Sequence, residues 1–139
     1  HQPAQFSDIM STCVELAGAT YPKEYQGRAI LPTAGQSILP IVKGKKMPER
    51  YIYAEHEGNR MVRKGDWKLV SANFKGDEWE LYNIKEDRTE QHNLSARHPR
   101  RVNRMAQLYF RWADANGVLP YPQLMNEYGG LEMKIYNKR

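Results

Sequence analysis

The sequence has few of the residues and segments that would define a chemistry on their own. Cys13 is the single cysteine among 139 residues, so no internal disulfide can form and no thiolate metal site can be assembled. No apolar run approaches the ~20 residues that cross a bilayer, so we expect no membrane partner. The N-terminus His1-Gln2-Pro3 also lacks the charged and apolar regions of a signal peptide, and we interpret the chain as a fragment.

The motifs of several enzyme classes are also absent. There is no Gly-X-X-X-X-Gly-Lys-Ser/Thr loop, no Gly-X-Ser-X-Gly elbow and no dinucleotide fingerprint. The histidines form no His-X-His or His-Glu-X-X-His pair, so no metal site is predicted; they are His1, His56, His92 and His98. Cys13 lies on the apolar side of a predicted helix without a basic neighbour at helical spacing, so we expect a buried, unreactive thiol.

The composition nevertheless predicts a folded domain. Hydrophobic residues make up 40% of the chain and aromatic residues 11%, which is enough for a real core. Lys and Arg outnumber Asp and Glu by 21 to 16, for a net charge of +5. This excess favours polyanionic partners or sulfated substrates, but it is also common on solvated surfaces.

The first fifty residues predict one helix and a connector. Ser7 is placed to cap a helix over residues 7–17, and Gly18 is placed to end it in the left-handed conformation. Its apolar stripe consists of Phe6, Ile9, Met10, Cys13, Leu16 and Ala17. Four prolines and three glycines follow within residues 19–49, which predicts an extended connector with at most a short helical turn after Ser37.

The middle of the chain changes to a two-residue period. It predicts an antiparallel meander of four short strands, over residues 51–55, 60–64, 67–71 and 79–83. Gly65-Asp66 fits a tight hairpin, and residues 73–77 fit a looser turn. The alternating residues Trp67, Leu69, Trp79 and Leu81 are expected to share one face.

A helix from Pro99 to Gly117 is expected to cover that face. Its apolar stripe consists of Val102, Met105, Ala106, Tyr109, Trp112 and Ala113, whereas Arg100, Arg101, Arg104 and Arg111 lie largely off it. The predicted fold class is therefore α+β, a four-stranded antiparallel sheet packed against one C-terminal helix. The tail over residues 119–139 has no clear period and is expected to wrap the surface or to pair through residues 134–136.

One polar segment is a candidate binding site. In Glu55-His56-Glu57-Gly58-Asn59-Arg60 an imidazole lies between two carboxylates at a strand end, followed by a glycine and a guanidinium. Loops on rigid sheets often carry ligand contacts, and Arg60 could bind an anion through its forked donors. The alternative is a polar hairpin loop whose charges neutralise each other.

Two further signals have plainer explanations. Asn93-Leu94-Ser95 is a glycosylation sequon, but such triplets arise often by chance. The basic segment from Arg97 to Arg104 suggests a module that binds nucleic acid or sulfated polysaccharide. The nearby aromatic residues are needed for the core, so a solvated basic face is favoured and nucleic acid is not an expected partner.

Several segments together resemble the C-terminal portion of bacterial arylsulfatases, in the family's order. The segments are Gln2 to Cys13, Gly35-Gln36-Ser37-Ile38-Leu39-Pro40, Glu55 to Arg60, Val62 to Val70 with its Gly-Asp-Trp-Lys-Leu-Val run, Trp79-Glu80-Leu81-Tyr82-Asn83, Asp87-Arg88-Thr89-Glu90, Asn93-Leu94 and His98-Pro99. The resemblance covers about residues 2–118. It implies an alkaline-phosphatase-like α/β catalytic domain, largely absent here, followed by a sheet-and-helix subdomain.

This resemblance also implies a division of the chain. Residues 1–20 would be the last helix of the catalytic domain, residues 21–49 a connector, residues 50–118 the C-terminal subdomain and residues 119–139 a tail. The implied partner is the protein's own catalytic domain. Self-association through helix 7–17 is a further possibility, and a periplasmic or secreted location follows from the family alone.

The family's reaction is hydrolysis of sulfate esters, on aryl or glycan sulfates, by a formylglycine beside a calcium ion. Neither group can be carried over, because Cys13-Val14-Glu15-Leu16-Ala17 does not match the formylglycine pattern and the acidic metal ligands belong upstream. We therefore expect no catalytic residue and no metal ligand here, with calcium and formylglycine in the absent catalytic domain. His56, Glu57 and Asn59 are the candidate residues bordering the substrate pocket. A fragment of a related phosphate or phosphonate ester hydrolase is the alternative within the superfamily.

Overall fold

The computed structural model describes residues 2–72 and 78–126. The chain divides into two compact units, an N-terminal unit of residues 1–49 and a sheet unit of residues 50–139. Each unit has its own internal contacts.

The N-terminal unit begins with helix α1 (Asp8–Leu16). Gly18 ends it with a φ of 59°, and the amides of Gly18 and Ala19 donate to the carbonyls of Glu15 and Val14. The predicted glycine stop is therefore confirmed. The predicted Ser7 cap is wrong, because Ser7 has helical backbone angles and its side chain makes no capping bond. A side chain reaches the first free amides from an extended backbone instead.

Asp8 joins the connector to the start of α1. This side chain is fully buried, and its carboxylate accepts from the amide of Gln5 at 2.7 Å and from that of Gln36 at 2.9 Å. The Thr12 hydroxyl donates to the Asp8 carbonyl and accepts from the amide of Ile38 at 3.0 Å. The unit is therefore held together at this point by buried polar contacts.

The connector has more regular structure than the sequence predicts. The short helix α2 (Leu39–Val42) confirms the turn expected after Ser37. A small hairpin of β1 (Glu24–Tyr25) and β2 (Arg28–Ala29), turning through Gly27 at a φ of 74°, was not predicted.

The apolar stripe of α1 faces outward. Phe6 is 92% exposed, Ile9 51%, Met10 55% and Leu16 65%, and Cys13 is exposed as well. The prediction of a buried Cys13 is wrong for this chain, because no described residue covers that side of the helix.

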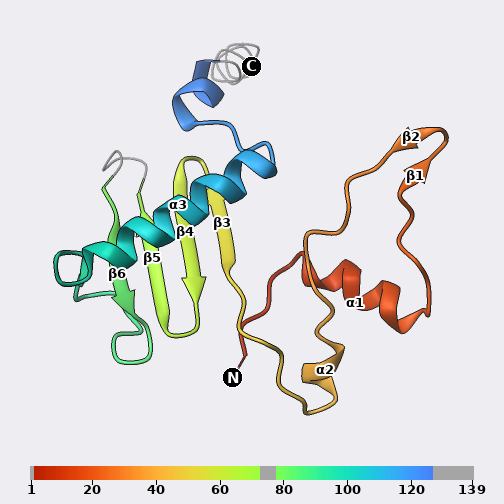
Figure 1. Ribbon diagram of the computed structural model, residues 1–139, viewed down its shortest axis with the longest axis horizontal. Helices are drawn as coiled ribbons and strands as arrows, with labels where there is room; N and C mark the ends of the chain where they lie inside the picture. Colours follow the sequence, from red (N-terminus) through yellow and green to blue (C-terminus); the bar gives the residue numbers. More distant parts are fainter. Residues whose placement is uncertain (1, 73–77, 127–139) are drawn as a thin grey trace, which may run out of the picture. The chain divides into compact units, whose positions relative to one another are not determined.

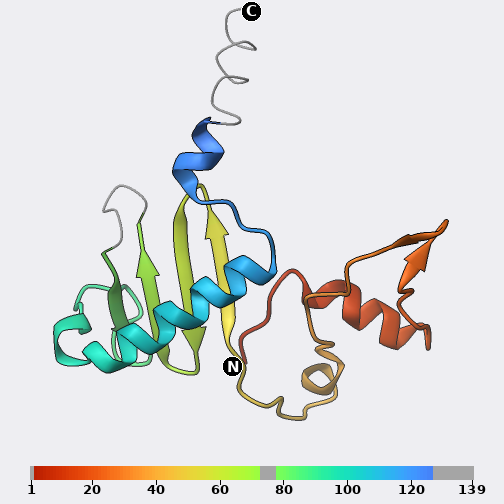
Figure 2. The same ribbon diagram turned by 45° about the horizontal axis from the view of Figure 1, so that its top comes forward.

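The sheet unit is an antiparallel meander in the order β3-β4-β5-β6, with α3 (Pro99–Ala115) running across one face (Figure 1). The strands are β3 (Ile52–His56), β4 (Asn59–Lys64), β5 (Trp67–Ser71) and β6 (Glu80–Asn83), all bounded within one residue of the prediction. Figure 2 shows the same two layers from a second direction. The predicted α+β class is confirmed. The turn expected at residues 73–77 lies outside the described residues.

The core lies between the sheet and α3. Val62, Leu69 and Leu81 occupy paired positions on three neighbouring strands and are fully buried. The buried helix residues Met105, Tyr109 and Ala113 close over them, with Val102, Ala106 and Trp112 packed alongside. Both predicted stripes are confirmed. Trp67 and Trp79 are half-buried at the two ends of this face.

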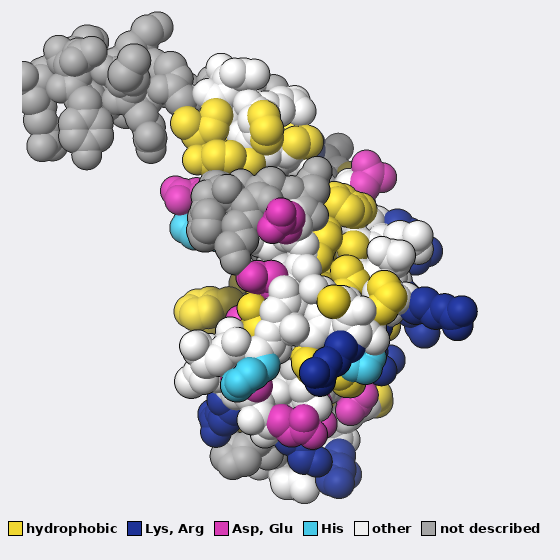
Figure 3. All heavy atoms as spheres, turned by 90° about the vertical axis from the view of Figure 1, so that its left-hand side faces the viewer, with side chains coloured by type: hydrophobic (Ala, Val, Ile, Leu, Met, Phe, Trp, Pro, Cys, Tyr) yellow, Lys and Arg dark blue, Asp and Glu magenta, His cyan; other side chains and the backbone are white. Residues whose placement is uncertain are grey.

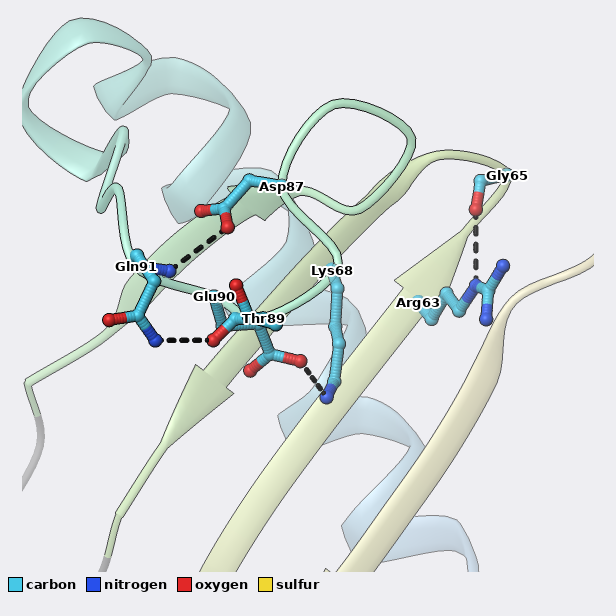
Figure 4. A network of polar contacts seen from close by, with 7 residues as sticks. All are labelled: Arg63, Gly65, Lys68, Asp87, Thr89, Glu90 and Gln91. Carbon is cyan, nitrogen blue, oxygen red and sulfur yellow. Dashed lines mark hydrogen bonds and ion pairs between the residues drawn. The ribbon is translucent and has the colours of Figure 1, made fainter.

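The opposite face of the sheet holds the loop that follows β6 (Figure 4). Lys68 reaches from β5 to the carboxylate of Glu90, and Arg63 donates to the Gly65 carbonyl at 3.1 Å. Asp87 accepts from the amides of Gln91 and His92, which closes the loop on itself. The contacts of Glu90 and Asp87 hold the chain before it enters η2 (Ser95–Arg97) and α3.

Asn93 extends the edge of the sheet. Its Oδ1 accepts from the amides of Leu81 at 3.1 Å and Ser95 at 2.9 Å, and the amide of Leu94 donates to the Leu81 carbonyl. This structural role accounts for the asparagine of the sequon. Beyond α3, residues 121–126 form a helical turn that the sequence did not predict, and the pairing considered for residues 134–136 lies outside the described residues.

Candidate functional site

The site is built on the hairpin that joins β3 to β4. His56 pairs with Asn59, and the two residues between them, Glu57 and Gly58, have φ values of 51° and 81°. Two positive φ values are typical of the two-residue turn that matches the twist of a hairpin. Glycine suits this conformation, whereas it is uncommon for a glutamate, so the Glu57 backbone carries some strain.

The three residues predicted to border a substrate pocket lie together at this hairpin tip. His56, Glu57 and Asn59 are all exposed, and the Asn59 side-chain amide donates to the His56 carbonyl at 2.9 Å. The residues on either side of them, Glu55 and Arg60, are half-buried. His56 and Asn59 therefore lie on the face opposite α3, and Glu55 and Arg60 on the face that α3 covers.

Glu55 and Arg60 form a polar row with Ser71 at one end of the apolar core. The strand register places these three residues side by side on β3, β4 and β5. The Glu55 carboxylate accepts from the Gly58 amide at 2.7 Å, and Arg60 donates to the Ser71 hydroxyl at 2.8 Å. The Arg60 guanidinium also lies 4.9 Å from the ring centre of Trp79. Both charged side chains are thus held in place beneath the tip.

A cavity of about 430 Å³ opens above this polar row. Its walls come from β3, β4, the C-terminal half of α3 and the segment after it: Glu55, Gly58, Arg60, Tyr109, Phe110, Ala113, Val118, Leu119, Pro120, Tyr121 and Pro122. None of the three predicted tip residues is among them. The two-residue period of the strands could have placed Glu55 and Arg60 on the face that α3 covers. No local sequence pattern predicts that residues 118–122 line the same cavity.

The cavity presents a carboxylate, a guanidinium and a neutral phenol between apolar walls. Burial, reinforced by the nearby Glu55 carboxylate and partly offset by Arg60, raises the pKa of Tyr109 to about 12. Tyr109 therefore keeps its proton at neutral pH and can act as a donor. Such groups can bind and orient a polar ligand, but the described lining residues include no activated nucleophile.

The described part of the chain shows no assembled metal site and no spanning helix. Over residues 2–72 and 78–126, His, Cys, Asp and Glu side chains nowhere gather in threes in a way that could hold an ion. Within the same residues, every helix is too short or too polar to cross a bilayer.

The sheet packed on one helix, with a polar hairpin tip at its edge, is the arrangement implied by the resemblance to sulfatases. Residues 2–111 match the family described as N-sulphoglucosamine sulphohydrolase, C-terminal. The chain belongs to this sulfatase family, and the resemblance drawn from its residues is confirmed.

Individual relatives agree with this family. The chain is 31% identical over 121 residues to an uncharacterized sulfatase of Schizosaccharomyces pombe, which covers 83% of this chain and 22% of the relative. It is 29% identical over 92 residues to the N-acetylglucosamine-6-O-sulfatase of Bacteroides thetaiotaomicron, covering 63% of this chain and 16% of that protein. A structure solved in complex with its substrate D-glucosamine-2-N,6-O-disulfate shares this fold, with a TM-score of 0.55 at 23% identity. The match covers 77% of this chain and 23% of that one.

The chain therefore spans less than a quarter of these relatives' lengths. Neither the nucleic-acid alternative nor the phosphate-ester alternative gains support from these matches.

Proposed function

We propose that this chain serves as the C-terminal part of a sulfuric ester hydrolase, which it completes and supports without carrying the catalytic groups. The match of residues 2–111 to the C-terminal family model is the observation that carries this proposal. The small share of each relative that the chain spans is consistent with a catalytic domain encoded elsewhere in the same protein.

The residues present do not fit the family's two catalytic groups. The segment Cys13 to Ala17 lacks the formylglycine pattern, and the described residues bring no three possible metal ligands together. We assign the formylglycine and the calcium ion to the catalytic domain and derive no chemical step from this chain. The chain alone is therefore expected to be inactive, on aryl sulfates as on other sulfate esters.

The exposed stripe of α1 supports the catalytic domain as a partner. Buried polar contacts at Asp8 turn one side of this helix toward the connector, while Phe6, Ile9 and Met10 stay in solvent. Apolar side chains exposed together on one side of a helix mark an interaction surface. Its occupant in our proposal is the catalytic domain of the same protein, and a second copy of the chain is the alternative outcome.

The hairpin tip supports a role at the border of the substrate pocket. His56, Glu57 and Asn59 offer exposed donors and acceptors on a turn whose base is fixed by Glu55 and Arg60. The substrates named for the relatives support a sulfated glycan as the ligand class. We further propose a periplasmic or secreted location, from the family alone.

The first experiment compares this 139-residue chain with the longer protein read from its gene. We expect hydrolysis of an aryl sulfate or of D-glucosamine-2-N,6-O-disulfate by the longer protein with calcium, and none by the chain alone. Turnover by the isolated chain that survives replacement of Cys13 would overturn the assignment of the catalytic groups.

The second experiment tests the tip within the longer protein. His56→Ala, Glu57→Ala and Asn59→Ala should each raise KM for a sulfated glycan. Asp66→Ala is the matched control, because Asp66 is also an exposed residue at a hairpin tip. Its hairpin joins β4 to β5 and lies at the end of β4 opposite to the β3–β4 tip. Equal effects from Asp66→Ala and the tip variants would show that the tip has no special contact with substrate.

A further inference from the structure

The net charge of the protein is concentrated in one segment. The whole chain has 21 Lys and Arg residues against 16 Asp and Glu residues. Residues 91–113 contain five arginines and no Asp or Glu, so the rest of the chain has 16 of each and is neutral. An excess confined in this way creates a local positive field, which a charge spread evenly over the surface would not.

Four of these arginines lie around the start of α3. Arg97 ends η2, and Arg100, Arg101 and Arg104 follow in the first two turns of α3; all four are exposed. We call them the α3 basic surface. The first turn of α3 has no acidic residue, so the positive end of the helix dipole adds to their charge. Figure 3 faces the side of the sheet unit where α3 begins, and Lys and Arg side chains project there among Asp, Glu and His side chains.

These charges are not neutralised within the described structure. None of the four arginines forms an ion pair with an Asp or Glu of residues 2–72 and 78–126. The nearby acids of the preceding loop have other partners, since Glu90 pairs with Lys68 and Asp87 accepts from the amides of Gln91 and His92. The α3 basic surface is therefore available to an anion from outside the described residues.

One guanidinium of this surface is held in place. Arg101 lies 3.9 Å from the ring centre of Trp67, and His98 meets the same ring edge-on with the ring centres 5.1 Å apart. A side chain that is already ordered loses less entropy when it binds. In addition, all five basic residues of the segment are arginines, whose forked donors suit the oxygens of sulfate and phosphate groups.

We propose that the α3 basic surface binds a linear sulfated polysaccharide through several sulfate groups at once. Single-stranded nucleic acid fits less well, because its recognition depends on exposed rings for base stacking. The ring beside this surface is that of Trp67, which is half-buried and already covered by Arg101. Such binding requires no sulfatase activity.

The test measures binding of the 139-residue chain to heparin over a range of salt concentrations. We expect affinity to fall steeply as salt rises, and chemically desulfated heparin to bind at least roughly ten-fold more weakly, because each ion pair displaces counterions. The triple variant Arg100→Gln/Arg101→Gln/Arg104→Gln should lose on the order of ten-fold in affinity and show a flatter salt dependence.

The connector offers a matched control. Lys43→Gln/Lys45→Gln/Lys46→Gln removes the same charge from three exposed residues of the N-terminal unit and should change affinity by less than about two-fold. Because Arg101 also packs on Trp67, the variant Arg97→Gln/Arg100→Gln/Arg104→Gln, which keeps that contact, guards against a loss of folding.

Two results would overturn the proposal. Equal losses in the arginine and lysine variants would mean that heparin responds to net charge alone. A single-stranded oligonucleotide that displaces heparin at equal charge concentration would assign the surface to nucleic acid instead.

Discussion

Replacing Gly35 with alanine should loosen the N-terminal unit while leaving the sheet unit intact. A Cβ atom at this position would lie 2.1 Å from the Ser7 carbonyl oxygen and 2.6 Å from the Asp8 amide nitrogen, both backbone atoms. Ordinary contact begins at 3.4 Å, so the connector and the start of α1 must separate by more than 1 Å. The Gly35 backbone has no positive φ, so the cost arises from crowding alone.

Three hydrogen bonds cross this contact and would be stretched. They join Gln36 to Asp8 at 2.9 Å, Ser11 to Gly35 at 3.0 Å and Ile38 to Thr12 at 3.0 Å. At ~1 kcal/mol each, their loss would destabilise the unit by about 3 kcal/mol. Amide hydrogen exchange at Gln36 and Ile38 should therefore accelerate by roughly two orders of magnitude, measurable by NMR.

Gly44→Ala is the control for this prediction. Nothing lies within 4 Å of a Cβ at Gly44, but its φ of 72° makes alanine unfavourable there by about 1 kcal/mol. Exchange of the Val62 amide in the sheet unit should not change in either variant. If Gly35→Ala left exchange at Gln36 and Ile38 as slow as in the parent chain, the close approach and the reasoning from it would be refuted.

Four further predictions concern the sheet unit. Leu69→Ala should lower the free energy of unfolding by about 2–5 kcal/mol in urea denaturation, because Leu69 is fully buried. Leu16→Ala, on the exposed stripe of α1, is the control and should change the free energy of unfolding by less than about 0.5 kcal/mol. Asn93→Ala should cost about 1–3 kcal/mol by leaving the Leu81 amide without its acceptor, and Asn93→Asp, which keeps an acceptor, should cost less in the same assay. Hydrogen bonds from the backbone amides of Gln91 and, to a lesser degree, His92 hold the pKa of Asp87 below its ordinary 3.8. The stabilisation of the loop by Asp87 is therefore complete above pH 3.8 and is lost as pH falls through the lower pKa of the folded state. The NMR shifts of the two amides should follow this loss, and Asp87→Asn should abolish the pH dependence. Ultraviolet titration should show a pKa of about 12 for Tyr109, whose contribution to stability is lost as pH rises from 10 to 12. Glu55→Gln should lower that pKa, because it removes a nearby negative charge.

The sheet and α3 were predictable because their signals are local and repeated. Alternation of Trp67 with Leu69 gives the buried face of β5, and the spacing of Met105, Tyr109 and Ala113 gives the side of α3 that covers it. These patterns depend only on neighbours along the chain, so they could be recognised without the structure.

The errors arose where a residue's environment depends on distant contacts. Cys13 shares a stripe with apolar residues, which predicted burial, but burial requires a partner that the described residues do not supply. In the sequence nothing distinguishes Asp8 from an ordinary first-turn acid, yet it is fully buried and accepts a hydrogen bond from Gln36, 28 residues away. The cavity was missed for the same reason, since the segment after α3 reaches Glu55 and Arg60 only through the tertiary fold.

The two-residue period of the β3–β4 hairpin places the residues that anchor the turn and the residues exposed at its tip on opposite faces of the sheet. Glu55 and Arg60 anchor the turn from one side of the strands, while His56 and Asn59 point to the other and are exposed. Substitutions of the exposed tip side chains can therefore leave the anchors in place. Under our proposal that the tip borders the substrate, related proteins can diverge in ligand preference there at little cost in stability. Under the same proposal, a library that varies only residues 56, 57 and 59 would explore new specificities while Glu55 and Arg60 keep the turn in place.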